Sequence, residues 1–442
     1  MKTPFLILFC ILSFTASLWG QNYEAFWTGH FSYLNINKVV DADDKFYAAS
    51  ENALFSYDLQ TNQLSTITTI NGLSGELIST LHYSNEYQLL LIGYENGLIE
   101  VYTESDQEIL KVVDIINKVT IPSSQKKINH FNEFNSLVYI ATDYGISVYD
   151  LEGLEFGDTY YIGDGGAQIS VSQTAILNNE IFAACSSISG IKSASLSNSN
   201  LTDFQLWNSL AGGGFKAITV FDTSLYAVNS ANKIFEISGA NFIPLFDYPQ
   251  DVAELNASNN SLLVTTNSKV YQYELGFNLT NVYSTTSEFD TSFVAALKMD
   301  EVVYIGTTDY GVLKSNPLAS SDYDEIHPIG PLKNEAFSLS HGYGNLWVSY
   351  GDYSIFFNPS PNKSYGISNY VDENWVNTTY DSIQQTTAMT VLNLNTISIN
   401  PLSPNQVFIS SFANGLLDFK KEESITLLDD SNSSLESLVL PG

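Results

Sequence analysis

The chain has 442 residues, of which 44% are hydrophobic and 13% aromatic, and it carries 48 acidic residues against 17 basic ones. The formal net charge is −31, and every basic residue is a lysine. A nucleic-acid-binding protein needs a positive surface to neutralise phosphates, so this composition excludes nucleic acid as a partner. The acidity favours solubility and leaves a calcium-dependent or cationic partner open. The chain is longer than the domains that a single hydrophobic core usually supports.

Residues 1–20 have the pattern of a secretory signal peptide. Lys2 supplies the positive charge, residues 5–14 form a short apolar core, and small residues follow up to Gly20. Cys10 lies inside the apolar core without a small residue before it, so we infer no lipoprotein signal. No later segment reaches the roughly 18 apolar residues of a transmembrane helix. The sequence therefore predicts an exported protein at the outer-membrane surface or in the periplasm.

Nine similar units follow in chain order, each an apolar strand, a polar turn and a second apolar strand. The clearest copies read LIGYENGLIEVY, YIATDYGISVYD, YIGTTDYGVLKS and FISSFANGLLDF, with Gly97, Gly145, Gly311 and Gly415 in their turns. The other units are centred near Ala53, Gly190, Lys233, Lys269 and Tyr353. The spacing is about 44 residues, the size of one four-stranded propeller blade. We therefore predict an all-β fold, a β-propeller.

Short runs rich in β-branched and aromatic residues mark the expected strands. Several of these runs, such as 89–92, are apolar on both faces, as a sheet stacked between two other sheets requires. No long amphipathic helical period is present. The predicted strands are 39–40, 46–49, 54–57, 89–92, 99–102, 137–141, 218–221, 225–228 and 302–306.

Nine units exceed one ring, since propellers hold four to eight blades. We predict a first propeller of about seven blades in residues 21–330, and in residues 331–442 a linker with blade units of an incomplete second propeller. A stretch rich in turn-forming residues begins at Asn358-Pro359 and places a domain boundary there or slightly earlier. Beyond about residue 390 we expect a lone blade-like hairpin.

No cluster of residues predicts catalysis, a cofactor or a metal. No two of the five histidines are spaced as a local metal pair, and we expect turn or core positions for them: His30, His82, His130, His327 and His341. No nucleophile elbow is present, and carboxylate neighbours such as Asp41, Asp43 and Asp44 are common in so acidic a chain. Gly212–Gly214 lacks the residues of a phosphate loop and is expected to be a flexible connection. Cys185 is expected to be a small buried hydrophobic residue.

Two further groups of side chains could form surfaces. Tyr94, Tyr144 and Tyr310 recur at one position of the repeat. They would stack against sugar if they surrounded the central opening, whereas packing between blades is the simpler expectation. The pairs Lys126-Lys127 and Lys420-Lys421 are expected in solvated turns.

Four motifs resemble a known family: TINGLS at 69–74, LIGYENG at 91–97, HGYGNLWV at 341–348 and YGIS at 365–368, the last followed by Trp375. The first and third resemble repeats of two-component-regulator propellers. Together with the signal peptide and an early Trp27, Ser32 and Tyr33, the layout resembles the amino-terminal half of PorZ-type proteins of the type IX secretion system. Family members carry two propellers and a sorting domain, so we expect this chain to be part of such a layout.

The resemblance implies a non-catalytic surface scaffold that works with protein partners of the secretion and attachment complex. It also implies recognition of an anionic lipopolysaccharide, although a chain without arginine offers little positive charge for one. Two alternatives stay open. One is the periplasmic sensor of a hybrid two-component regulator, and the other is an extracellular polysaccharide-active enzyme that draws two carboxylates from distant blades.

Overall fold

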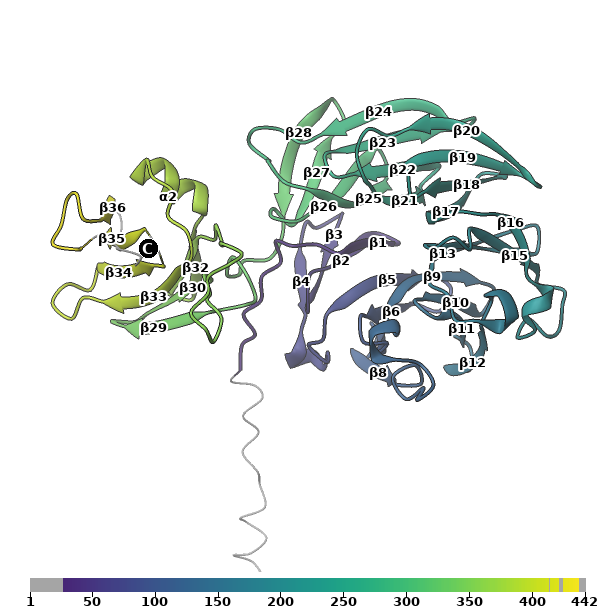
Figure 1. Ribbon diagram of the computed structural model, residues 1–442, viewed down its shortest axis with the longest axis horizontal. Coiled ribbons are helices and arrows are strands. Elements are labelled where there is room, and N and C mark those ends of the chain that lie inside the picture. Colours follow the sequence, from purple (N-terminus) through teal and green to yellow (C-terminus); the bar gives the residue numbers. More distant parts are fainter. Residues whose placement is uncertain (1–26, 413, 421–423, 437–442) are drawn as a thin grey trace, which may run out of the picture.

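Nine antiparallel four-stranded sheets follow one another along the part of the chain that the structure describes, and within each sheet the strands pair in sequence order (Figure 1). The computed structural model describes residues 27–412, 414–420 and 424–436, so the predicted signal peptide lies outside the described residues. Every predicted repeat centre lies in the turn between the second and third strands of its sheet or is the first residue of the third strand. The all-β propeller class is confirmed, and we call the sheets blades 1 to 9.

The first four blades have these strands. Blade 1 contains β1 (Lys38–Ala42), β2 (Lys45–Ala49), β3 (Leu54–Asp58) and β4 (Leu64–Ile67). Blade 2 contains β5 (Ile78–Ser84), β6 (Leu89–Tyr94), β7 (Ile99–Thr103) and β8 (Glu108–Val112). Blade 3 contains β9 (Ile128–Phe134), β10 (Leu137–Thr142), β11 (Gly145–Asp150) and β12 (Glu155–Tyr160). Blade 4 contains β13 (Val171–Leu177), β14 (Glu180–Cys185), β15 (Ile191–Ser195) and β16 (Asn208–Ala211).

Three more blades continue the ring. Blade 5 contains β17 (Phe215–Phe221), β18 (Ser224–Asn229), β19 (Lys233–Ser238) and β20 (Asn241–Asp247). Blade 6 contains β21 (Val252–Ser258), β22 (Ser261–Thr266), β23 (Lys269–Glu274) and β24 (Asn278–Ser284). Blade 7 contains β25 (Phe293–Met299), β26 (Val302–Thr307), β27 (Val312–Asn316) and β28 (Ala319–Ile326). Short 3-10 turns in the connections are η2 (Thr69–Asn71), η3 (Ser123–Gln125), η4 (Asp164–Gly166) and η5 (Phe204–Leu206).

Blades 1 to 7 close into a ring. The first strand of each blade packs against the first strand of the next, and β25 packs against β1 to complete the circle. Buried aromatic and aliphatic side chains, among them Phe46 and Leu297, join blade 7 to blade 1. The backbone N–H of Ile36 also donates to the Thr307 carbonyl at 2.8 Å. The ring is thus held by apolar contact between sheets and by a short segment that precedes β1.

The inner strands of blades 2 to 7 share a β-bulge close to their first residue. A bulge turns the extra side chain out of the regular ladder. In three blades that side chain donates to a backbone carbonyl of the next inner strand: Ser79 Oγ to Ile128 (2.7 Å), Asn129 Nδ2 to Val171 (2.9 Å) and Ser172 Oγ to Phe215 (3.0 Å). These hydrogen bonds add a polar connection to the side-chain packing between neighbouring blades.

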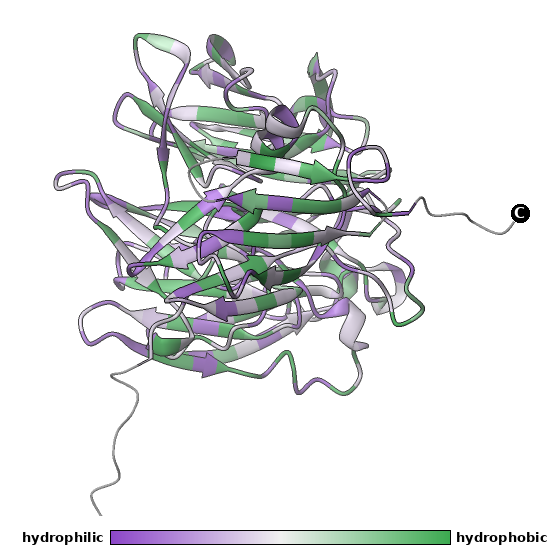
Figure 2. Ribbon diagram, turned by 90° about the vertical axis from the view of Figure 1, so that its left-hand side faces the viewer, coloured by the Kyte–Doolittle hydropathy of each residue, from purple (hydrophilic) through white to green (hydrophobic). Residues whose placement is uncertain are grey.

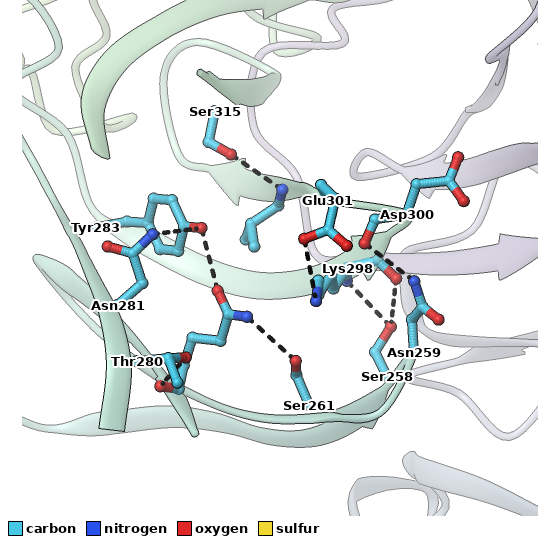
Figure 3. A network of polar contacts seen from close by, with 12 residues as sticks. Ser258, Asn259, Ser261, Thr280, Asn281, Tyr283, Lys298, Asp300, Glu301 and Ser315 are labelled. Atoms are coloured by element: carbon cyan, nitrogen blue, oxygen red, sulfur yellow. Dashed lines mark hydrogen bonds and ion pairs between the residues drawn. The ribbon is translucent and has the colours of Figure 1, made fainter. Parts of the chain in front are cut away.

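Blade 6 uses different residues for the same connection, because Ala253 occupies its bulge. Ser258 Oγ donates to the Lys298 carbonyl at 2.9 Å and accepts from the Lys298 N–H at 3.0 Å (Figure 3). Asn259 Nδ2 donates to the Asp300 carbonyl at 3.1 Å beside it. Blades 6 and 7 are therefore joined at the far end of their inner strands.

Glycine is required in the repeated turn for a steric reason. A Cβ on Gly145 would lie 2.3 Å from the Tyr160 carbonyl oxygen, and one on Gly190 would lie 1.7 Å from that of Ala211. In both blades the third strand begins directly beside the end of the fourth. The glycine recognised from sequence thus allows the outer strand to close onto the turn.

Blades 8 and 9 form a separate pair of packed sheets. Blade 8 contains β29 (Ser338–Gly342), β30 (Asn345–Ser349), β31 (Ile367–Val371) and β32 (Asn374–Thr378). Blade 9 contains β33 (Leu394–Ile399), β34 (Gln406–Ser411), β35 (Gly415–Lys420) and β36 (Ser424–Leu428). A helix, α2 (Tyr380–Thr387), connects the two blades. Figure 2 shows hydrophobic residues along the strands of the stacked sheets and hydrophilic residues in many of the loops between them.

The expected lone hairpin beyond residue 390 is wrong. Strands β33 to β36 form a four-stranded sheet whose face packs against blade 8 around Trp347, Ile383 and Leu417. The turn-rich stretch from Asn358 lies inside blade 8, since β30 pairs directly with β31 across it. The boundary near residue 330 stays a prediction.

Candidate functional sites

The ring encloses a cavity of about 340 Å³ at its centre. The inner strands of blades 1 to 6 line it, and the ring's axis therefore runs through a polar channel rather than a packed core. Its polar and charged lining residues include Lys38, Asp41, His82, His130, Asn132, Glu133, Gln173, Thr174, Thr219 and Asn256.

Two contacts reach across this channel between blades that are not neighbours. The Lys38 ammonium of blade 1 pairs with the Glu254 carboxylate of blade 6. Gln173 Nε2 of blade 4 lies 3.5 Å from the Leu255 carbonyl, also of blade 6. Glu254 in turn accepts from the Ala296 N–H at 2.8 Å. These contacts fix the positions of the side chains around the opening.

His82 and Glu133 join blades 2 and 3 at the channel wall. His82 Nε2 lies 2.7 Å from Glu133 Oε2, and Ser84 Oγ donates to Glu133 Oε1 at 2.9 Å. Both carboxylate oxygens are therefore occupied. The sequence predicted a turn or core position for His82, and the structure places it on a water-facing polar wall instead.

His130 lies beside this pair, and its environment fixes its tautomer. Gln173 Nε2 donates toward the Leu255 carbonyl and lies 3.4 Å from His130 Nε2, so that ring nitrogen accepts. Burial, with the charges of Lys38 and His82, holds the pKa of His130 well below its ordinary value. The neutral ring therefore carries its proton on Nδ1, for which no hydrogen-bond partner exists among the described residues.

A second cavity, of about 430 Å³, lies where the ring meets blade 8. The N-terminal segment, a turn of blade 7 and the start of α2 line it. Its aromatic residues are Tyr310, Tyr365 and Tyr380, and the Lys333 ammonium lies 4.5 Å from the centre of the Tyr365 ring. We call this cavity the junction cleft.

The three tyrosines of the repeat do not surround the channel. Tyr94 and Tyr144 are buried between blades, where Tyr94 bonds the Glu100 carboxylate and Tyr144 lies 2.7 Å from Ser147 Oγ. Tyr310 is half-buried against Phe289 and faces the junction cleft. Packing between blades, the simpler expectation, holds for the first two.

Of the two lysine pairs, Lys126 differs from the expectation of a solvated turn. Lys126 is only 8% exposed, and its Nζ donates to the Ile116 carbonyl at 2.5 Å. Its aliphatic stem packs under the turn of blade 2, which local polarity in the sequence does not reveal. Lys127 is exposed and pairs with Glu95 at 3.0 Å. Lys420 lies at the end of β35, and Lys421 lies outside the described residues.

Cys185 is fully buried, and burial raises the pKa of its thiol to about 12, so the thiol is unreactive. Gly212–Gly214 is held by backbone bonds, including Gly213 N–H to the Ile188 carbonyl at 3.2 Å. Within the described ranges no group of three or more histidine, cysteine and carboxylate side chains could hold a metal ion. No helix there is long and apolar enough to cross a membrane. The expectation of no catalytic, cofactor or metal residue stays a prediction.

Fold and sites together define a seven-bladed propeller with a polar central channel and two further blades. Residues 46–208 match the family model described as the N-terminal β-propeller domain of PorZ of the type IX secretion system. This match confirms, over these residues, the resemblance to PorZ-type proteins that the sequence motifs predicted.

One solved structure shows the same architecture. PorZ of Porphyromonas gingivalis, described as an essential bacterial surface component of the type IX secretion system, superposes with a TM-score of 0.77 at 17% identity. The match covers 92% of this chain and 54% of that one, so this chain spans about half the length of that protein. At this identity the likeness shows the fold alone. A designed protein, Ika8, aligns over 72% of this chain and 94% of its own, at 12% identity and with a TM-score of 0.47. No curated protein sequence matches this chain.

Proposed function

We propose that this protein is a surface component of a type IX secretion apparatus and acts by binding rather than by catalysis. The match of residues 46–208 to the PorZ propeller family carries the proposal. The protein is expected to be exported and to act at the outer-membrane surface or in the periplasm.

Deletion of the complete gene tests this role. The expected result is that secreted cargo stays unprocessed and unattached, and that the intact gene restores both. Normal processing and attachment of cargo in the deletion strain would overturn the proposal. Turnover of a polysaccharide by the purified chain would instead support the enzyme alternative.

The junction cleft is the surface that we propose for a protein partner. It combines three tyrosines with Lys333 and the exposed carboxylates of Asp309 and Asp381. Aromatic side chains with adjacent polar groups are typical of protein interfaces. A photo-crosslinking residue at position 381 should capture a component of the secretion complex, whereas the same residue at exposed Asn278 should not. Equal capture at both positions would contradict the assignment.

Anionic lipopolysaccharide is expected to bind these residues weakly. The chain has no arginine, and most described lysines already pair with a carboxylate, a carbonyl or an aromatic ring. A binding assay with the cell's own anionic lipopolysaccharide, comparing this chain with the full-length protein, tests the expectation. Tight, salt-sensitive binding by this chain alone would contradict it.

A further inference from the structure

The central channel contains polar atoms that no described residue satisfies. Three side chains that line it have a buried atom without a hydrogen-bond partner: Nδ1 of His130, Nδ2 of Asn132 and Oγ1 of Thr174. Leaving one such group unpaired costs about 1–3 kcal/mol. They come from the inner strands of two adjacent blades, β9 and β13, and all three line one cavity.

The chemistry of these atoms defines what would satisfy them. The tautomer of His130 makes its Nδ1–H a donor, and the Asn132 amide nitrogen is also a donor. The Thr174 hydroxyl, in a residue only 2% exposed, can donate and accept. An occupant must therefore present at least two oxygen acceptors on the side that faces blades 3 and 4.

The charges around the cavity disfavour an ion. The Lys38 ammonium is already paired with Glu254, so no free cation awaits an anion, and Asp41 and Glu133 would repel one. A cation would meet the single carboxylate of Asp41, and to gain a second carboxylate it would have to compete with His82 and Ser84 for Glu133 or with Lys38 for Glu254. Breaking such a satisfied pair leaves one charged group without its partner, and this costs more free energy than the new contact with the ion provides. A neutral occupant is not repelled by the carboxylates and does not have to break these pairs.

We propose that the channel binds a small neutral polyhydroxyl molecule of the monosaccharide class, held by Asn132, His130 and Thr174. Sugar hydroxyls supply the required acceptors and can also donate to the Asn132 carbonyl oxygen. The volume of about 340 Å³ lies within the usual range for small-molecule sites. Tyr83 and Phe131 provide apolar lining for the carbon skeleton. The site is separate from the junction cleft and does not depend on the secretion role.

Titration of the whole chain with D-galactose, D-mannose and N-acetyl-D-glucosamine, followed by saturation-transfer NMR and calorimetry, tests the proposal. At least one sugar should bind. Asn132→Asp, which keeps the shape but replaces the donor with a charge, should weaken binding about tenfold or more, and Thr174→Val should weaken it by a similar factor. Thermal unfolding of each variant shows whether it is folded.

Thr265→Val is the matched control. Thr265 is also a fully buried threonine with an unpaired hydroxyl, but it lies on β22 and does not line the channel. Sugar binding should be unchanged in this variant. Failure of every sugar to bind the wild-type chain would overturn the proposal, as would binding that Asn132→Asp and Thr174→Val leave intact. Equal binding of inorganic phosphate would overturn the neutral class.

Discussion

His130 is a residue whose protonation the folded state opposes. Its pKa is held well below the ordinary value of 6.5 by burial and by nearby positive groups. Below pH 6.5 the unfolded chain therefore binds a proton that the folded chain does not. The free energy of unfolding should fall by up to about 1.4 kcal/mol for each pH unit below that point, until the folded pKa is reached.

Urea unfolding at about pH 7.5 and about pH 5.5 measures this effect. Carboxylates contribute to the same pH range, so the useful quantity is the difference between the wild type and His130→Gln. We expect the stability of the wild type to fall more between the two pH values. If the wild type and His130→Gln lost the same stability between the two pH values, His130 would have to be hydrated in the folded state.

At Thr265, in contrast, removal of a polar atom should increase the stability of the folded protein. Its hydroxyl is fully buried on β22 without a partner. Valine has nearly the same shape and favours strands, so Thr265→Val removes the desolvation cost and leaves the packing intact. We expect a gain of about 1 kcal/mol in the free energy of unfolding, measured in urea. A loss of stability would mean that an unobserved partner satisfies the hydroxyl.

At the scale of the strand, the bulges on the inner strands determine how blades are connected. Ser79 donates across the interface to the Ile128 carbonyl, and Ile128 is fully buried. Ser79→Ala removes the donor and leaves that carbonyl without this bond. The expected cost is about 1 kcal/mol in the free energy of unfolding.

The control for Ser79→Ala is Ser65→Ala, on the exposed outer strand β4. Both changes replace a serine in a strand, but the second breaks no bond between blades. A change near zero is expected for Ser65→Ala. If the two variants lost the same stability, the cost would come from strand propensity and not from the connection between blades.

The repeat was predictable because one turn imposes a steric rule. Gly145 and Gly190 lie where the third strand begins, against the end of the fourth, and the strands beside them are five or six residues long. The bulges were not predictable, since their residues range from Ser79 to Ala253 and Val294 and share no chemistry. Strands β33 and β36 were both missed, the second because SITLL is short and follows a polar stretch, and these omissions produced the erroneous lone hairpin.

The side-chain pairs of the central channel could not be predicted from the sequence either. His82 and Glu133 are 51 positions apart, and Lys38 and Glu254 are 216 apart. Sequence spacing carries no information about which blades face each other across the axis. Only ring closure brings these side chains together, so the histidines could be counted from sequence but not paired.

At the scale of the whole molecule, the segment before β1 connects the ring to blade 8. The Ser32 N–H donates to Asn334 Oδ1 at 2.7 Å, and Ser32 Oγ donates to the Leu332 carbonyl at 2.9 Å. Asn334 Nδ2 also donates to Glu51 of blade 1 at 3.0 Å. The N-terminal segment, the first blade and the connection to blade 8 thus meet at one asparagine.

Asn334→Ala should loosen this junction and leave the ring intact. Both polar ends of Asn334 are used, and Ser32 is only 3% exposed, so its N–H would lose its partner in a buried position. Hydrogen exchange should become faster at residues 31–35 and 331–336, while β6 and β10 keep their protection. Asn278→Ala, on an exposed strand, should change neither region. Faster exchange throughout the ring would show that the junction stabilises ring closure itself, because Ile36 and Thr307 would then open together with Asn334.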